Sequence, residues 1–182
     1  MRAGQGDMRK KQRLLFIGDS LIEYFDWERR FPDHTVYNLG IAGETVGGLK
    51  GRLRRIFANI QPPDKVFIMS GINNLAMGDD HFLDDYREIV RAISSSYPAA
   101  TIYVLSLLPV LFPYIANEDI GKMNAKLRDM AAQEASFFLD LHAAFLDERG
   151  TPVPAYLLDD GVHISDKGYR VWSEDIERLL AR

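Results

Sequence analysis

The chain has 182 residues, of which 47% are hydrophobic, and its formal net charge at pH 7 is −4. This length suffices for one domain with a sizeable core and is short for two. Phosphate binding needs clustered Lys and Arg, and the one basic stretch, residues 9–13, is short and interpreted as a solvated tail. No nucleic-acid partner is therefore expected. The absence of cysteine excludes a disulfide framework, a thiol nucleophile and a thiolate metal site.

The sequence predicts neither a signal peptide nor a membrane span. The apolar run at residues 14–17 is too short for the hydrophobic region of a signal peptide, and the run at residues 107–115 is interrupted by Pro109 and Pro113. We therefore expect a cytoplasmic protein, while its oligomeric state stays open.

Five short apolar runs follow one another along the chain, separated by segments with helical periodicity. The runs are residues 14–17, 35–39, 66–69, 102–107 and 137–141. None of them alternates cleanly with polar residues, which is typical of strands buried on both faces of a parallel sheet. Residues 1–12 are polar and are expected to form a disordered tail ahead of a single domain, residues 13–182.

Four apolar stripes with helical spacing are interpreted as the core-facing sides of helices. They are Val46, Leu49, Leu53, Ile56 and Phe57; Phe82, Tyr86, Ile89, Val90 and Ile93; Ile120, Met123, Leu127, Met130 and Ala131; and Tyr169, Trp172, Ile176, Leu179 and Leu180. Ser165 is a plausible N-cap of the last helix, and one or two weak turns are expected after Ser20. The alternation of strands and helices predicts a three-layer α/β/α sandwich.

Small, polar and titratable residues follow the predicted strands. They lie in residues 18–21, 38–45 and 70–74, and a further group, residues 159–163, precedes the last helix. Ligands of an open α/β sheet bind beyond the carboxyl ends of its strands, so we expect these groups to meet at one edge of the sheet.

The types of these residues fit one reaction. The hydroxyl of Ser20 needs a base to become a nucleophile, and the imidazole of His163 can supply it. Asp160 lies three residues before His163, close enough for its carboxylate to orient the imidazole. Gly43 offers a backbone N–H at the start of a helix and Asn73 offers a side-chain amide, both of which can donate to an oxyanion.

These segments together resemble the SGNH hydrolase family, also called GDSL esterases and lipases. The resemblance runs from about residue 13 to the C-terminus and is carried by four blocks: residues 16–21 (FIGDSL), 38–45 (NLGIAGET), 71–74 (GINN) and 160–163 (DGVH).

The resemblance implies a five-stranded parallel sheet in a flavodoxin-like arrangement, the SGNH hydrolase fold, with no metal or other cofactor. It assigns Ser20 as the nucleophile, Asp160 and His163 as its triad partners, and the N–H of Ser20, Gly43 and Asn73 as the oxyanion hole. Asn74 stands where many members of the family carry aspartate, a position that is usually structural.

Several other residues have competing interpretations. Asp159 competes with Asp160 as the triad acid, but the Asp-x-x-His spacing favours Asp160. Asp19 is interpreted as structural, with its carboxylate bonded to loop N–H groups, and Gly40 as permitting a tight exit from the second strand.

His34, His81 and His142 are interpreted as surface or incidental residues. Leu21, Leu75 and Val162 are candidate substrate-binding residues, with ordinary packing as the alternative.

The leading hypothesis is hydrolysis of a small-molecule carboxylic ester through an acyl-enzyme. The compact chain and the lack of an obvious lid insertion favour short acyl groups such as acetyl. An alternative is a lysophospholipase or thioesterase that acts on longer acyl chains. Two alternatives belong to other classes: a metal-dependent phosphoesterase that uses Asp19, Asn73, Asp160 and His163 as ligands, and a non-catalytic flavodoxin-like binding module for FMN or a carbohydrate.

Overall fold

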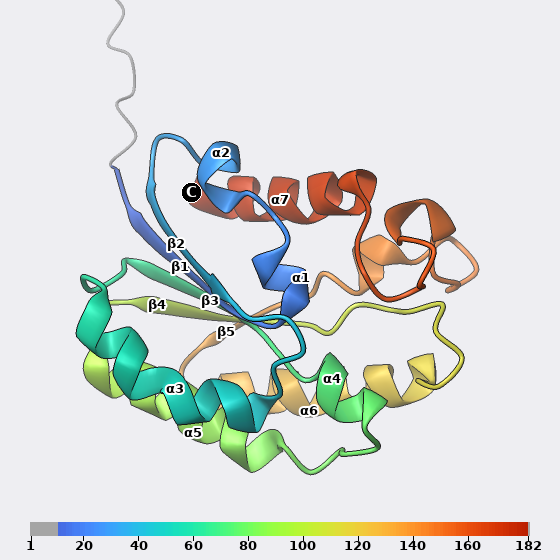
Figure 1. Cartoon of the computed structure of the whole chain (residues 1–182), viewed down its shortest axis with the longest axis horizontal. Helices are drawn as coiled ribbons and strands as arrows, with labels where there is room; N and C mark the ends of the chain where they lie inside the picture. The colour runs from blue at the N-terminus through green and yellow to red at the C-terminus, as the bar shows by residue number, and fades with distance from the viewer. Residues whose placement is uncertain (1–10, 182) are drawn as a thin grey trace, which may run out of the picture.

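A computed structural model describes residues 11–181 and arranges them around one sheet of five parallel strands (Figure 1). The strands are β1 (Arg13–Gly18), β2 (Thr35–Gly40), β3 (Lys65–Met69), β4 (Thr101–Leu105) and β5 (Phe137–Leu139), in the spatial order β2-β1-β3-β4-β5. Every neighbouring pair is parallel, so the carboxyl ends of all five strands meet at one edge. The predicted five-stranded parallel sheet and its flavodoxin-like strand order are confirmed.

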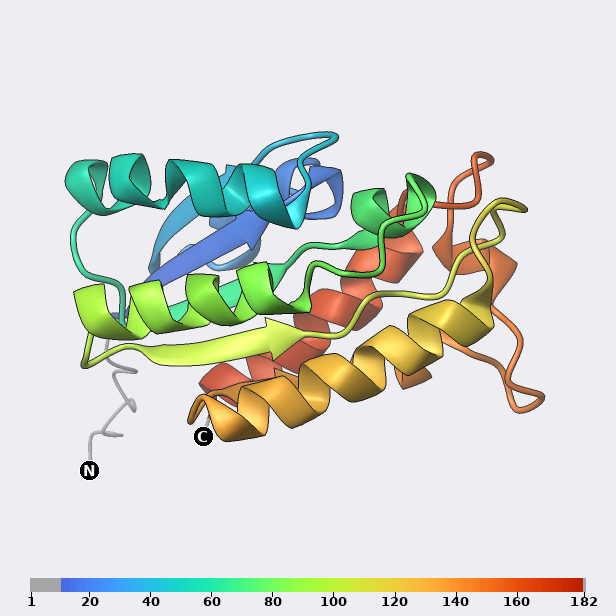
Figure 2. The same cartoon turned by 90° about the horizontal axis from the view of Figure 1, so that it is seen from below.

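Helices cover both faces of the sheet, as Figures 1 and 2 show. The helices are α1 (Ser20–Glu23), α2 (Trp27–Arg30), α3 (Val46–Asn59), α4 (Ile72–Ala76), α5 (Leu83–Ser96), α6 (Asn117–Gln133) and α7 (Asp166–Leu180), with the 3₁₀ turns η1 (Ala143–Phe145) and η2 (Pro154–Tyr156). α1, α2 and α7 lie on one face, and α3, α5 and α6 lie on the other. The four predicted apolar stripes correspond to α3, α5, α6 and α7, and the three-layer sandwich is confirmed.

Aromatic side chains fill the layer between the sheet and α7. Phe16 on β1 stacks on Trp27 of α2 with ring centroids 4.2 Å apart, and Trp27 meets Trp172 of α7 edge to face at 5.1 Å. All three side chains are fully buried. Such contacts add to the free energy of area burial, and they fix α2 and α7 over the first strand of the sheet.

The expectation that all five strands are buried on both faces is wrong for the two edge strands. β2 is mostly half-buried, and Phe137 at the start of β5 is 60% exposed. Each edge strand has a neighbour on one side only, so its side chains receive less cover than those of β1 and β3.

The predicted tail, residues 1–12, lies outside the described residues except for Lys11 and Gln12. The backbone N–H of Gln12 donates to Nδ1 of His34 at 3.2 Å, and its carbonyl accepts from the N–H of Thr35 at 2.8 Å. Gln12 therefore belongs to the folded part rather than to the tail. Within residues 11–181, no helix is both long and apolar enough to cross a membrane.

The N-cap of α7 provides a test of local stability. The Oγ of Ser165 accepts a hydrogen bond from the N–H of Gly168, and the hydroxyl donates to the carbonyl of Ala155. We expect Ser165→Ala to lower the free energy of unfolding by about 1 kcal/mol, because a helical N–H loses its partner. Urea unfolding measures the change. Ser165→Asp keeps an acceptor at the cap, so it should lose less, and equal losses in both variants would contradict the capping role.

Candidate active site

Ser20 is the first residue of α1, and one residue, Asp19, separates it from the end of β1. Asp19 is the N-cap of this helix, and its Oδ1 accepts the N–H of Leu21 at 3.0 Å. A helix of four residues is not stable alone, so its position depends on contacts with the rest of the fold.

Two side chains from other helices bond to the carbonyl groups of α1. The hydroxyl of Tyr169 on α7 donates to the carbonyl of Leu21 at 3.0 Å, and Nε1 of Trp27 on α2 donates to the carbonyl of Ile22 at 2.9 Å. These bonds satisfy buried backbone groups and hold the turn that presents Ser20.

The end of β2 lies directly against α1. A Cβ atom on Gly40 would overlap the backbone of Glu23, so only glycine permits this close approach. Asn38 on β2 donates from Nδ2 to the carbonyl groups of Glu23 and Phe25, at 3.2 and 3.1 Å. Gly40 is therefore required for the close approach of α1, and Asn38 is an additional anchor that the sequence analysis did not single out.

A chain of hydrogen bonds links Asp160, His163 and Ser20. Nε2 of His163 lies 3.0 Å from Oγ of Ser20, although the two residues are 143 positions apart. Nδ1 of His163 lies 2.6 Å from Oδ2 of Asp160, and Oδ1 of Asp160 accepts the backbone N–H groups of Val162 and His163 at 2.9 Å each. The structure thus brings the three predicted triad residues together and makes Asp160, rather than its exposed neighbour Asp159, the partner of the imidazole.

The carboxyl group of Asp160 is held in its ionised form. Partial burial raises its pKa, but the hydrogen bonds from the His163 ring and from the N–H groups of Val162 and His163 outweigh that effect, so the pKa is lower than usual. A carboxylate that stays charged can fix the tautomer of His163 and stabilise its imidazolium form.

The two other candidate oxyanion donors, Gly43 and Asn73, lie on adjoining segments. Nδ2 of Asn73, on α4, donates to the carbonyl of Glu44 at 2.9 Å, which fixes the amide beside the loop that contains Gly43. A side-chain amide carries two N–H groups, so one is left for a ligand.

Gly43 does not begin a helix, contrary to expectation. Its φ of +74° belongs to a turn that glycine favours, and α3 begins at Val46 with Thr45 as its N-cap. The N–H of Gly43 is therefore presented by a turn two residues before the helix cap.

Asn74 has the structural position expected of it. It is 5% exposed, its Oδ1 accepts the N–H of Val46 at 3.0 Å, and its Nδ2 donates to Asp79 at 2.7 Å. It therefore ties α4 to the first turn of α3.

Asp19 differs from a simple loop carboxylate because it is completely buried. Burial raises its pKa to about 7, opposed by the hydrogen bond from Leu21 and by the nearby positive charge of His163, while the charge of Glu44 raises it further. The expected bonds to loop N–H groups are replaced by one bond, from the N–H of Leu21 in α1 to Oδ1. Oδ2 is buried without a hydrogen-bond partner among residues 11–181.

The three candidate substrate-binding residues have different surroundings. Leu21 is 2% exposed and packs in the core, which leaves little of its surface for a substrate, so the alternative of ordinary packing holds for it. Val162 is half-buried and packs against the core. Leu75 is also half-buried and lines a pocket of about 440 Å³ together with Tyr114 and Met123.

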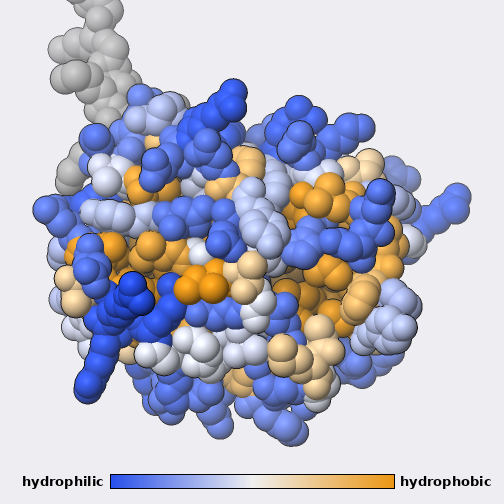
Figure 3. Space-filling view, viewed as in Figure 1, coloured by the Kyte–Doolittle hydropathy of each residue, from blue (hydrophilic) through white to orange (hydrophobic). Residues whose placement is uncertain are grey.

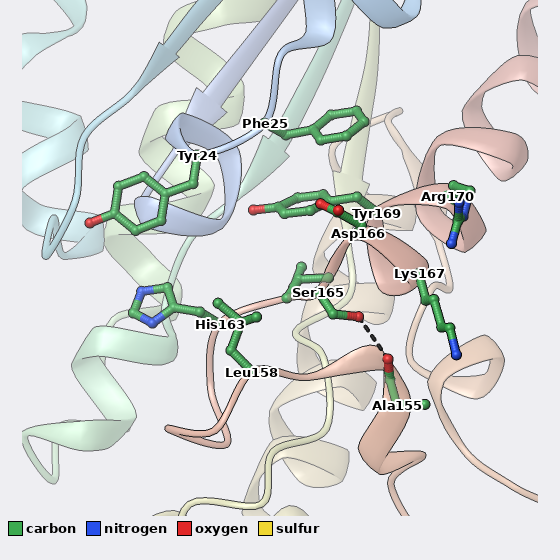
Figure 4. A pocket seen from close by; sticks show the side chains of 11 residues that line it. Tyr24, Phe25, Ala155, Leu158, His163, Ser165, Asp166, Lys167, Tyr169 and Arg170 are labelled. Carbon is green, nitrogen blue, oxygen red and sulfur yellow. Dashed lines mark hydrogen bonds between the residues drawn. The ribbon is translucent and has the colours of Figure 1, made fainter.

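A larger pocket, of about 640 Å³, adjoins His163 (Figure 4). Tyr24 and His163 face each other at one end of it, with ring centroids 5.3 Å apart, and Lys167 and Arg170 lie at the other end. The sequence analysis missed Tyr24. It stands four residues after Ser20 in a segment expected to be helical, a spacing that places two side chains on the same side of a helix.

The remaining histidines do not join this site. His34 contacts Gln12, and His81 is exposed beside Asp80. His142 is half-buried rather than on the surface, and burial lowers its pKa. Among residues 11–181, no group of three or more His, Cys, Asp or Glu side chains is arranged to hold a metal ion, so the ligand set of the phosphoesterase hypothesis does not come together.

Comparison with known proteins agrees with this geometry. The model of the GDSL-like Lipase/Acylhydrolase family matches residues 16–171. The acetylxylan esterase of Geobacillus stearothermophilus is 30% identical over 152 residues, covering 75% of this chain and 67% of the relative. The platelet-activating factor acetylhydrolase IB subunit alpha2 of Gallus gallus is 25% identical over 177 residues, covering 94% and 77%.

Solved structures share the fold of this chain. A structure from Streptococcus pneumonia superposes with a TM-score of 0.85 at 27% identity, over 94% of this chain and 85% of the other. The acetylxylan esterase Axe2 of Geobacillus stearothermophilus superposes with a TM-score of 0.75 at 25% identity, over 97% of both chains.

The chain belongs to the GDSL-like Lipase/Acylhydrolase family. It is a serine esterase, a hydrolase of carboxylic esters, as its sequence predicted.

The buried carboxyl group of Asp19 makes stability depend on pH. Between about pH 4 and pH 7 the folded state keeps a proton that the unfolded state has lost, so stability falls as the pH rises through this window. Asp19→Asn cannot ionise. We expect it to unfold like the parent at pH 4 and to be more stable above pH 7, by at most about 4 kcal/mol. Urea unfolding at both pH values measures this, and a gain that is the same at both would contradict it.

Proposed function

We propose that the enzyme removes short acyl groups, acetyl first, from carboxylic esters through an acyl-enzyme on Ser20. The observation that carries this proposal is the continuous hydrogen-bond chain from Asp160 through His163 to Ser20, with distances of 2.6 and 3.0 Å. The 3.0 Å distance lies within the range that proton transfer from the nucleophile to its base requires, and the 2.6 Å distance lets Asp160 orient the imidazole.

The first half of the reaction forms the acyl-enzyme. Oγ of Ser20 attacks the carbonyl carbon while its proton passes to Nε2 of His163. The carbonyl oxygen becomes an oxyanion, which the N–H groups of Ser20 and Gly43 and the free N–H of Asn73 stabilise. The tetrahedral intermediate then collapses, the C–O bond to the alcohol breaks, and His163 returns the proton to the leaving oxygen.

The second half releases the acid. Water attacks the acyl carbon, His163 takes the proton of the water, and collapse of the second intermediate returns that proton to Oγ of Ser20. Throughout, Asp160 keeps the imidazole oriented and stabilises its charged form. Since Asp160 and His163 are adjacent on one tight turn, their geometry is preserved through both halves.

Two observations favour a short acyl group. The names of the acetylxylan esterase and of the platelet-activating factor acetylhydrolase both refer to acetyl groups. In addition, Ser20 is only 6% exposed, and Leu21 beside it is part of the core, which leaves little space around the nucleophile.

The rim of the site favours an ester whose alcohol has an apolar part. Most of the exposed large apolar side chains of residues 11–181 lie in loops after strands, at the ends of the short helices α1 and α4, or before α7: Tyr24, Ile41, Met77, Leu111, Tyr114 and Leu158. Figure 3 shows apolar surface among polar surface at the end of the molecule where these loops lie. Surface of this kind around a nucleophile suits apolar contact with the substrate.

Loss of the nucleophile tests the proposal directly. We expect Ser20→Ala to lower kcat/KM for p-nitrophenyl acetate by about 10⁴-fold or more, because the acyl-enzyme can no longer form. Thermal unfolding should change little. An organophosphonate should label Ser20 of the parent protein, as detected by mass spectrometry of peptides. Undiminished turnover in the variant would end the proposal.

The acyl preference is tested with acetyl, butyryl and octanoyl esters of one alcohol. We expect the highest kcat/KM for acetyl and a loss of about tenfold or more for octanoyl, since the methylenes beyond a small pocket gain no contacts and displace side chains. An optimum at octanoyl would instead favour the lysophospholipase or thioesterase alternative.

A further inference from the structure

Beside the nucleophile lies a second carboxyl group that the reaction above does not use. Asp19 directly precedes Ser20, is completely buried, and bonds through Oδ1 to the N–H of Leu21 within α1. Oδ2 is also buried and has no hydrogen-bond partner among the described residues. An unpartnered carboxylate oxygen in the core lowers the free energy of unfolding, and a function of this group would account for that cost.

We propose that Asp19 is a positioning residue with an electrostatic role: its carboxyl group fixes the turn of Ser20 and, when ionised, stabilises the imidazolium of His163. This inference rests on the proposed function, because the imidazolium is the species that forms when His163 accepts the proton of Ser20.

The other titratable groups that act on Asp19 cannot balance the negative charge of its carboxylate, so His163 is its partner. The hydroxyl of Tyr86 on α5 donates to the carbonyl of Ile68 at 3.1 Å, and that of Tyr169 on α7 donates to Leu21. Burial raises the pKa of both tyrosines, with the charge of Asp19 as the next cause, so both hydroxyls stay neutral.

Glu44, in the loop before α3, is the other acidic group that acts on Asp19, and its carboxylate is paired with the guanidinium of Arg52. His163 is therefore the group of opposite sign, and its positive charge favours the ionised form of Asp19. The attraction is mutual, so ionised Asp19 favours the imidazolium equally.

Both charge states of Asp19 are accessible near neutral pH, because burial raises its pKa to about 7. Below that pH the group is a neutral cap for α1. Above it, the group carries a charge one residue from Ser20, whose Oγ lies 3.0 Å from Nε2 of His163, and it does so inside the protein, where water screens its charge little. The benefit to the reaction should therefore grow as the pH rises through neutrality.

The substitution Asp19→Asn separates the positioning of the turn from the electrostatic role. Asp19→Asn keeps an oxygen at Oδ1 for the N–H of Leu21 and places an amide where the neutral acid has its hydroxyl, so the turn is preserved and only the ionised form is lost. Asp159→Asn is the matched control, because Asp159 is an exposed carboxylate one position from Asp160.

The experiment is the pH profile of kcat/KM for p-nitrophenyl acetate, from about pH 5.5 to pH 9, in the parent protein and in both variants. We expect Asp19→Asn to remain within about twofold of the parent at the acidic end and to fall about tenfold below it at the alkaline end. Asp159→Asn should follow the parent throughout.

A profile of Asp19→Asn that coincides with the parent, or that falls by one factor at every pH, would overturn the electrostatic role. Organophosphonate labelling separates this failure from failure of the proposed function. Labelling of Ser20 in both proteins with coinciding profiles rejects only the role of Asp19. Absence of labelling at Ser20 in the parent rejects the nucleophile itself.

Discussion

The hydrogen bond between Ser20 and His163 is the interaction on which the rest of the site depends. It joins the end of β1 to the loop before α7, two segments at opposite ends of the chain. α7 supports both partners, because the hydroxyl of Tyr169 holds α1 and the loop that enters the helix carries His163. The edge-to-face contact of Trp172 with Trp27 fixes α7 over the sheet. Packing of α7 thus contributes to the distance between Ser20 and His163 from both sides.

Parallel pairing made much of this arrangement predictable from the sequence. All strands of such a sheet end at one edge, so residues that follow different strands must meet there, and Asp160 reaches His163 because the two share one turn. The unpredicted features depend on contacts between distant segments. The burial of Asp19 comes from elements far along the chain, and the half-exposed state of β5 follows from its place at the edge, which no local pattern records. The sequence predicts a helix start at Gly43, whereas the helix begins at Val46 with Thr45 as its N-cap. The two positions are so close that the sequence pattern does not separate them.

The buried carboxyl group of Asp19, next to the proposed nucleophile, lowers the stability of the fold. An aspartate with its pKa raised to about 7 lowers the stability of the fold at every pH above its ordinary pKa, and an uncharged residue there would remove that cost. Its structural role is to accept the N–H of Leu21 at the start of α1, and the side chain of asparagine can accept the same N–H. Retaining an ionisable group at this position therefore makes physical sense when the charge itself acts on the neighbouring imidazole.

The two carboxyl groups near His163 have opposite surroundings, and this difference divides their effects. The side chain of Asp160 is 50% exposed and bonds directly to the ring, so it determines orientation, while water screens much of its charge. Asp19 is completely buried, so its field acts through a medium that screens little. The direct hydrogen bond lets Asp160 orient the ring and stabilise its charged form, and the field of buried Asp19 is proposed to add to that stabilisation. A buried carboxylate without such a bond has no means of fixing the tautomer. Under the proposed roles, Asp160 supplies the geometry at His163 and Asp19 adds to the electrostatic field there.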